Sequence, residues 1–386
     1  MPITATRPSQ DALHAALATV QDPEIKRPIT ELGMVDEVSL DDDGTVHVRV
    51  LLTVSGCPLK ETLTRDTQTA VGAVEGVSRV EVELGVMSDE QRQGLREQLK
   101  GGATTKEIPF SRPESLTRVL AVASGKGGVG KSSVTVNLAV AMARTGLSVG
   151  VVDADVYGHS VPDMLGVGER RPTQVEDMIM PVEAHGVRVI SIGMLKPRRD
   201  QVVAWRGPML DRALVQMLSD VFWGDLDVLL LDLPPGTGDI AISLGQHLAN
   251  AEVVVVTTPQ QAAADVAERA GTMASMMHQR VAGVVENMSF LPCPHCGPEH
   301  RLEVFGSGGG DRVAATLGQR FGYDVPVLGR VPLDGRLRAS GDDGTPLVLS
   351  DPESPAGAEL AGVATRLTSR ARGLAGLQLG LTPAGR

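Results

Sequence analysis

The sequence is poor in aromatic side chains and carries no excess of positive charge. Phenylalanine, tyrosine and tryptophan make up only 2% of its 386 residues, and the formal net charge at pH 7 is -11. Nucleic-acid-binding domains usually present a basic surface, and those that bind single strands add aromatic rings on which bases stack. Both features are missing here, so we expect no nucleic-acid partner.

Long apolar runs and cysteines are also scarce. The most apolar stretches, such as VLLLDL and EVVVV, are far shorter than the ~20 residues that a membrane helix needs. The start, MPITATRPSQ, has no basic segment followed by an apolar one, as a secretory signal would. Three cysteines, two of them in one C-x-x-C motif, suit a reducing compartment better than a disulfide framework. We therefore expect a cytoplasmic protein with no membrane partner.

The periodicity of apolar residues predicts two domains and a linker. Residues 1–100 read as a small α+β domain, and residues 101–116 break every periodicity, as a linker does. From 117 to 386, short apolar runs alternate with helical stretches, which predicts an α/β domain with a doubly wound parallel sheet. The predicted strands of this sheet are 119–123, 147–152, 187–192, 227–231, 253–257, 281–285 and 327–331.

Smaller elements are predicted at both ends of the chain. In the first domain we expect a helix capped by Ser9, strands at 35–40, 45–53 and 77–86, a helix from Pro58, and a helix begun by a capping box of Ser88 and Gln91. The final helix, about 355–374, carries Arg366, Arg370 and Arg372. We interpret it as a packed helix with a solvated face rather than a membrane-surface helix.

A glycine-rich loop, GKGGVGKSS at 125–133, is the strongest functional signal. It contains the motif G-x-x-x-x-G-K-S, with a predicted strand before it and a predicted amphipathic helix after it. Its backbone N–H groups and the helix dipole favour phosphate. The motif assigns Lys131 to the β- and γ-phosphates and the Ser132 hydroxyl to Mg²⁺. The predicted nucleotide-binding residues here are Gly125, Lys126, Gly127, Gly128, Val129, Gly130, Lys131, Ser132 and Ser133.

The loop contains a second lysine, Lys126, directly after its first glycine. In this respect GKGGVGKSS resembles the deviant Walker A loop of the signal-recognition, MinD and nitrogenase-reductase class. In that class the early lysine reaches across a dimer interface to the partner's nucleotide. The resemblance implies a homodimer in which Lys126 is catalytic together with Lys131; a lysine that points into solvent is the alternative.

Carboxylates follow two predicted strands. LDVLLLDLPPGTGD places Asp232 at a strand end, where a Walker B carboxylate holds Mg²⁺ through water, and the following proline–glycine loop can sense the γ-phosphate. VVDADVYGHS places Asp153 and Asp155 at another strand end, with both side chains expected to point the same way. In similar ATPases the position matching Asp155 orients the attacking water, which implies a catalytic role. A simple cap of the following turn is the alternative.

The base is predicted to be adenine. No N-K-x-D guanine signature is present, and Asn287, in VVENMS, has an amide that can pair with the edge of adenine. In the family that the phosphate loop resembles, this asparagine lines the base pocket together with a proline that matches Pro332. A second glycine-rich stretch, GSGGG at 306–310, reads as a flexible turn rather than another anion site, because no lysine–serine pair follows it.

The segment FLPCPHCGPEH offers a metal two cysteine ligands, Cys293 and Cys296. Its prolines and Gly297 predict an open loop, and His295 lies between the cysteines, where it cannot easily share their metal. A lone C-x-x-C is typical of a redox pair or of half a zinc site, or it arises by chance. In a face-to-face dimer, two copies of the loop would supply four thiolates, a full set for a [4Fe–4S] cluster.

Taken together, the motifs over about 117–350 resemble the Mrp/ApbC family of cytosolic iron–sulfur cluster carriers. The stretches that carry the resemblance are SGKGGVGKSS, VDADVYGHS, WRGPM, LDLPPGTGD, VVENMSF with CPHCG, and GRVPLDGRLR. The resemblance implies a homodimeric ATPase that binds ATP, Mg²⁺ and a labile [4Fe–4S] cluster, and that works with cluster scaffold proteins and iron–sulfur apoproteins. The alternative is a positioning ATPase of the MinD/ParA type with structural zinc at the cysteines.

The first hundred residues have a resemblance of their own. VQDPEI, ELGMVDEVSL and LLTVSGCP resemble the small domain of iron–sulfur assembly accessory proteins. Cys57 precedes Pro58 at a predicted helix start, where the dipole favours a thiolate. Our hypothesis is that Cys57 binds or passes iron–sulfur material; a small buried residue is the alternative.

Overall fold

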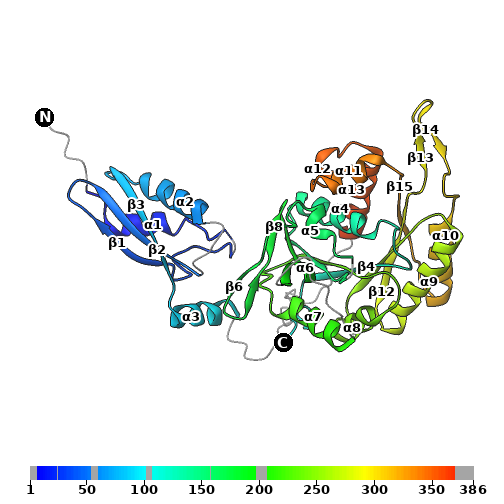
Figure 1. The fold of residues 1–386 in the computed structure, drawn as a ribbon, viewed down its shortest axis with the longest axis horizontal. Coiled ribbons are helices and arrows are strands. Elements are labelled where there is room, and N and C mark those ends of the chain that lie inside the picture. Colours follow the sequence, from blue (N-terminus) through cyan, green and yellow to red (C-terminus); the bar gives the residue numbers. More distant parts are fainter. Residues whose placement is uncertain are drawn as a thin grey trace, which may run out of the picture. The chain divides into compact units, whose positions relative to one another are not determined.

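The chain folds into two compact units (Figure 1). The computed structural model describes residues 7–23, 25–53, 60–100, 107–156, 158–196 and 207–369. The first unit contains the described residues before 107 together with 172–181 and 220–224, and the second contains the remainder. Cys57, Pro58, Arg370 and Arg372 lie outside the described residues.

The first unit is built on a three-stranded sheet in the order β1–β2–β3. Strand β2 pairs antiparallel with β1 and parallel with β3. The valines of β2 alternate with polar residues as the sequence predicts, and Val46, Val48 and Val50 are buried. The bounds are β1 Val35–Leu40, β2 Thr45–Leu52, β3 Arg79–Val86, α1 Gln10–Leu17, α2 Lys60–Gly72 and α3 Asp89–Lys100.

Two predicted helix starts of this unit are present. The Ser9 hydroxyl accepts a hydrogen bond from the Ala12 N–H at 3.2 Å and caps α1. At α3, the Ser88 N–H donates to Gln91 Oε1 at 2.8 Å, while the Gln91 N–H donates to the Ser88 hydroxyl at 3.2 Å. This reciprocal pair is the predicted capping box, and it satisfies two backbone donors that a helix start leaves free.

A hairpin from much later in the chain completes the core of the first unit. It consists of β6 Thr173–Val175 and β7 Met178–Met180, which pair antiparallel. Val175, Met178 and Met180 are buried in the same apolar cluster as Leu13 and Val46. No sequence pattern indicated this hairpin, because three-residue strands show no readable periodicity.

The second unit contains an eight-stranded sheet in the order β15–β12–β11–β4–β10–β5–β9–β8. All seven predicted strands are present and parallel, and the unpredicted β8 pairs antiparallel at one edge. The bounds are β4 Arg118–Ser124, β5 Val149–Asp153, β8 Val182–Ala184, β9 Val187–Ser191, β10 Val228–Asp232, β11 Glu252–Thr257, β12 Arg280–Asn287 and β15 Val327–Val331.

Helices cover both faces of this sheet, as a doubly wound fold requires. Helices α4, α5, α11, α12 and α13 lie together on one face, and α7, α8, α9 and α10 pack in sequence on the other (Figure 1). The bounds are α4 Lys131–Arg144, α5 Val161–Met164, α6 Ile192–Leu195, α7 Gly207–Ser219, α8 Asp239–His247, α9 Gln261–Met276, α10 Gly309–Phe321, α11 Gly335–Asp342, α12 Leu347–Ser350 and α13 Pro355–Thr368.

The prediction that the helix after the phosphate loop is amphipathic was wrong. Ten of the fourteen residues of α4 are buried. The cause is a second layer, because α12 and α13 pack against the side of α4 that would otherwise meet solvent. Most of the central helix of the unit is therefore held by packing, and the phosphate loop joins it at its amino end.

The predicted linker packs more closely than the sequence indicates, and the final helix is packed, as predicted. In the predicted linker, Ile108 and Phe110 are buried beside a short 3-10 turn at Pro109–Ser111, and the Asn250 side chain donates to the Phe110 carbonyl at 3.0 Å. Helix α13 packs against α4 and β15. It ends at Thr368, earlier than predicted, and positions from 370 onward lie outside the described residues. Across the part of the chain that the structure describes, no helix is long and apolar enough to cross a bilayer.

The inserted hairpin gives a test of the first unit. Because Met178 is buried in the core of that unit, we expect Met178→Ala to destabilise it by about 2–5 kcal/mol. Amide hydrogen exchange of β2 should rise accordingly. Met276→Ala is the matched control, since that side chain is 70% exposed. Unchanged exchange in β2 of the Met178 variant would contradict the shared core.

Candidate nucleotide site and cysteine hairpin

The phosphate loop connects the end of β4 to the start of α4, as predicted. Gly130 is the N-cap of α4 and has φ of +80°. A Cβ atom at this position would lie 2.2 Å from Nδ2 of Asn287. Glycine is therefore required twice over, by the backbone conformation and by the close approach of the predicted base-binding asparagine.

Lys131 and Asp232 form a buried ion pair at the centre of the site. Lys131 Nζ lies 2.7 Å from Asp232 Oδ2, and these side chains are 6% and 0% exposed. The Ser132 hydroxyl donates to the same carboxylate oxygen at 2.6 Å. On the other side, the Thr135 hydroxyl lies 2.7 Å from Asp232 Oδ1. The carboxylate is thus held through both oxygens.

The arrangement of oxygens in this cluster suits a magnesium ion. Mg²⁺ prefers hard oxygen ligands and usually binds through one or two carboxylates together with substrate phosphates and water. The Ser132 hydroxyl and the Asp232 carboxylate lie side by side at the amino end of α4, directly after the phosphate loop. Both predicted metal ligands are therefore brought together.

Asp153 adds a second buried carboxylate. It ends β5 and is the register partner of Asp232 at the end of β10. Burial, together with the negative charge of Asp232, raises the pKa of Asp153 to about 8. Its oxygens accept hydrogen bonds from the Ser191 hydroxyl at 3.1 Å and the Asp155 N–H at 3.2 Å. Asp153 therefore holds a proton more readily than an ordinary carboxyl group does, and the ion pair of Lys131 is made with Asp232.

The other two predicted catalytic residues make hydrogen bonds elsewhere within this chain. Asp155 Oδ1 accepts the Gly158 N–H at 3.0 Å, so the carboxylate caps the turn after β5. Lys126 is half-buried and donates to Gln260 Oε1 at 3.2 Å. Neither of these contacts involves Lys131 or Asp232.

A cavity of about 610 Å³ lies beside the phosphate loop. Its lining includes Gly130 and Ser133 of the loop together with Asn287 and Pro332, the two residues predicted for the base pocket. Ligand pockets typically have volumes of about 300–1,000 Å³. The cavity therefore suits a nucleoside next to a phosphate-binding loop.

The side-chain nitrogen of Asn287 has a hydrogen-bond partner among the described residues, whereas its side-chain oxygen has none. Nδ2 donates to the Val129 carbonyl at 2.9 Å. Oδ1 is buried, and no described residue donates a hydrogen bond to it. Buried acceptors usually have partners, so a ligand or water donor is expected here. The amino group of adenine is such a donor, whereas guanine carries a carbonyl at the corresponding position, so the geometry favours adenine.

The cysteines lie on a β-hairpin, so the prediction of an open loop was wrong. Strands β13 Leu291–Cys293 and β14 Gly297–Leu302 pair antiparallel, and the hairpin extends away from the sheet (Figure 1). Proline is tolerated in such edge strands, and Gly297, with φ of +89°, supplies the turn. The same residues that suggested a loop therefore build the hairpin.

The two cysteines are joined by a hydrogen bond at the hairpin tip. Cys293 is half-buried and Cys296 is exposed. The Cys296 N–H donates to Cys293 Sγ at 3.4 Å, and this bond, with that from the His295 N–H, lowers the pKa of Cys293. Among the described residues, no three His, Cys, Asp or Glu side chains are grouped so as to hold a metal ion. The pair is therefore incomplete within the described part of one chain.

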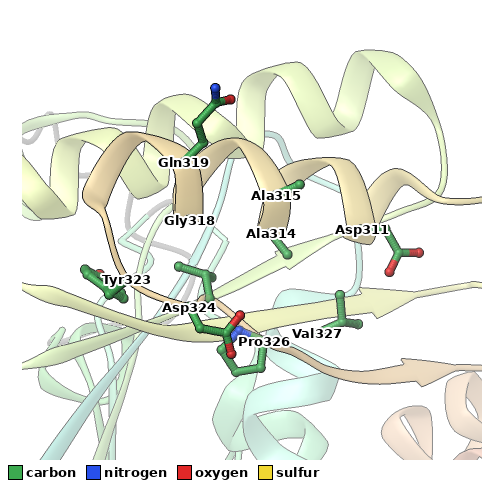
Figure 2. Close-up of a pocket in the computed structure, with 10 residues that line it drawn as sticks. Asp311, Ala314, Ala315, Gly318, Gln319, Tyr323, Asp324, Pro326 and Val327 are labelled. Atoms are coloured by element: carbon green, nitrogen blue, oxygen red, sulfur yellow. The ribbon is translucent and has the colours of Figure 1, made fainter.

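A second cavity, of about 490 Å³, lies between α10 and the start of β15. Figure 2 shows Asp311 and Tyr323 at its two ends and Asp324 between them. Asp311 is paired with Arg330 at 2.5 Å, and the Tyr323 hydroxyl accepts the Val281 N–H at 2.9 Å. This cavity contains no predicted site residue.

Sequence reasoning missed two residues of the site. Thr135 lies one helical turn after Lys131 on the same face of α4, and that spacing could have indicated its contact with Asp232. Glu286 is part of the ENM stretch, but nothing in its spacing indicated a partner. One of its partners, Ser289, is three residues away, and the other, Gly310, is brought near by the fold.

The chain is similar to proteins of known family over both units. Residues 115–368 match the model of the NUBPL iron-transfer P-loop NTPases, and residues 10–84 match that of an iron–sulfur cluster assembly protein. A Mycobacterium tuberculosis protein named iron–sulfur cluster carrier protein is 59% identical over 372 residues, 96% of each chain. An Escherichia coli protein of the same name is 38% identical over 353 residues, 90% of this chain and 89% of that one.

One similar solved structure contains a bound nucleotide. A nucleotide-binding protein from Archaeoglobus fulgidus, in complex with ADP, is 35% identical and superposes with a TM-score of 0.52. The match covers 63% of this chain and 92% of that chain. The similarity supports the P-loop fold of the second unit.

The hydrogen bonds at the hairpin tip predict how Cys293 reacts. Because the N–H groups of Cys296 and His295 stabilise the thiolate, the rate of alkylation by iodoacetamide should reach half its plateau at lower pH in the folded protein than in urea. The measurement uses Cys57→Ser/Cys296→Ala, in which Cys293 is the only cysteine. Equal midpoints in the folded and unfolded protein would contradict the thiolate-stabilising turn.

Proposed function

The chain belongs to the NUBPL iron-transfer P-loop NTPase family, and on that premise we propose that it is an ATP-hydrolysing carrier that delivers iron–sulfur clusters to apoproteins. Its relatives at 38–59% identity are named iron–sulfur cluster carrier proteins. The observation that carries the proposal is the cysteine hairpin, which offers two thiolates at an accessible tip and, among described residues, has no third ligand.

The incomplete ligand set supports a dimer. A [4Fe–4S] cluster takes four cysteine thiolates, and each chain provides Cys293 and Cys296 at one hairpin tip. In our proposal two copies face each other and hold the cluster between them. A cluster shared in this way is labile, because separation of the two hairpins removes half of its ligands. Such a site suits cargo that has to be released.

ATP is proposed to set the geometry of the dimer. The cavity beside the phosphate loop takes the nucleoside, and Lys131 moves its charge from Asp232 to the phosphates. Bound Mg²⁺ would be held by the Ser132 hydroxyl and, through water, by Asp232, and would offset the phosphate charge. We propose that Asp155 orients the attacking water and that Lys126 reaches the partner's nucleotide. Hydrolysis then changes the contacts between subunits, as in other γ-phosphate switches.

The alternative of a positioning ATPase with structural zinc receives less support. The names of the relatives indicate cluster carriage. The match of residues 10–84 to an iron–sulfur cluster assembly protein points the same way. We propose that the protein works in the cytoplasm with scaffold proteins as cluster donors and apoproteins as acceptors, and that Cys57 assists in the exchange.

Anaerobic reconstitution with iron and sulfide tests the proposed cargo. We expect about four irons and four sulfides per dimer, with a broad visible absorption, and loss of both in Cys293→Ala/Cys296→Ala. Cys57→Ser is the matched control and should retain the full load, because it leaves both hairpin tips intact. One tightly bound zinc per dimer, without iron uptake, would contradict the carrier function but not the ATPase activity.

The phosphate loop and the hairpin should be separable by mutation. Lys131→Ala removes charge-assisted hydrogen bonds to phosphate, each worth about 1.5–3 kcal/mol, so ATP turnover should fall below detection. The cysteine pair is untouched, and cluster uptake should remain at the wild-type level. Lys60→Ala, which removes an exposed lysine of α2, should leave both properties unchanged. Loss of iron binding in the Lys131 variant would contradict this separation.

A further inference from the structure

Glu286 is a buried carboxylate that the proposed mechanism does not use. It lies in β12, one residue before the base-binding Asn287, and is 1% exposed. Acidic side chains are almost never fully buried unless they are paired or fully hydrogen-bonded. Its register partner along the sheet, Arg330, forms its ion pair with Asp311, although the Arg330 charge also acts on Glu286. Glu286 depends on other donors.

One donor is the amino terminus of α10. Glu286 Oε2 accepts the Gly310 N–H at 2.6 Å, in the first turn of this thirteen-residue helix. A Cβ atom on Gly310 would lie 2.9 Å from the Glu286 Cβ, so only glycine permits the contact. The predicted flexible turn GSGGG is therefore a helix start, and the anion that it binds is the protein's own carboxylate.

The other donor lies at the root of the cysteine hairpin. Glu286 Oε1 accepts the Ser289 hydroxyl at 2.7 Å, and Ser289 is buried. The bond closes a short loop around Asn287 and Met288, both of which line the nucleoside cavity. Met288 has φ of +55°, a conformation that needs support from its surroundings. The carboxylate therefore supports the short loop that carries the base-binding residue.

Two backbone hydrogen bonds connect the loop that is closed by Glu286 and Ser289 to the root of the hairpin. The Ser289 N–H donates to the Val331 carbonyl at 2.9 Å, and the Leu333 N–H donates to the Phe290 carbonyl at 2.7 Å. These bonds lie on either side of Pro332, the other residue of the base pocket. Strand β13 begins at the next residue, Leu291. Both sides of the base pocket are thus joined to the root of the hairpin.

We infer that Glu286, acting through Ser289, is a positioning residue that joins the adenine contact and the cysteine hairpin into one body. A nucleotide in the base pocket therefore changes the position of the cysteine hairpin, and a bound cluster changes the affinity of the protein for nucleotide. The inference rests on the proposed function, because it gives the link between ATP and the cluster. It requires reciprocity, since a coupling free energy between two sites acts equally in both directions.

The test compares nucleotide affinity with and without the cluster. The dissociation constant of a fluorescent, non-hydrolysable ATP analogue is measured on cluster-loaded and cluster-free protein. We expect the two values to differ by about fivefold or more in the wild type, as is typical of coupled sites. Ser289→Ala removes only the hydroxyl that bonds to Glu286. It should bring the ratio of the two dissociation constants below about twofold. Glu286→Ala, where it folds, should do the same.

Ser243→Ala is the matched control. The Ser243 hydroxyl is also buried and donates to a carboxylate, that of Asp211, at 2.5 Å between α7 and α8. Its loss should leave the wild-type ratio intact. A wild-type ratio in Ser289→Ala overturns the inference, and so does equal affinity in the wild type when both ligands bind. Failure to load any cluster in the wild type overturns the carrier function itself, so the two failures are distinguishable.

Discussion

The site is organised around one lysine ammonium set among two buried carboxylates. Lys131 is surrounded by protein at the end of the sheet, next to Asp232 and close to Asp153. A buried charge that loses its partner is costly by several kcal/mol. Lys131 will therefore leave Asp232 only for a site with more negative charge, which the phosphates of a nucleotide supply. The remaining features of the site exclude water from the Lys131 ammonium and hold it in position.

The doubly wound sheet meets that requirement. The phosphate loop and both carboxylates lie where β4, β5 and β10 end, side by side in the sheet. Helix α4 is enclosed by a second layer of helices, so its first turn cannot shift without disturbing the core. The same edge continues to β12 and β15, which bring Asn287 and Pro332 to the cavity. Predicted nucleotide-binding residues that are far apart in the sequence thus meet at one edge of the sheet.

Features that depend on neighbouring residues could be predicted from the sequence, whereas features that depend on contacts between distant residues could not. Buried parallel strands and the phosphate loop have local signatures, so all seven parallel strands were found. The cysteine hairpin was interpreted as a loop, because proline and glycine are equally typical of edge strands and of turns. The hairpin at 172–181 and the contact of Glu286 with Gly310 depend on contacts between distant segments. No local pattern encodes such contacts, and they emerged only with the fold.

The inserted hairpin also bears on how the protein is made. The apolar cluster of the first unit includes Met178 and Met180, and residues 220–224 belong to the same unit. A ribosome adds about 5–20 residues per second. The amino-terminal segment therefore waits roughly 6–24 seconds, while about 120 further residues are synthesised, before its core can close. We expect the nascent chain to expose part of this core during that interval.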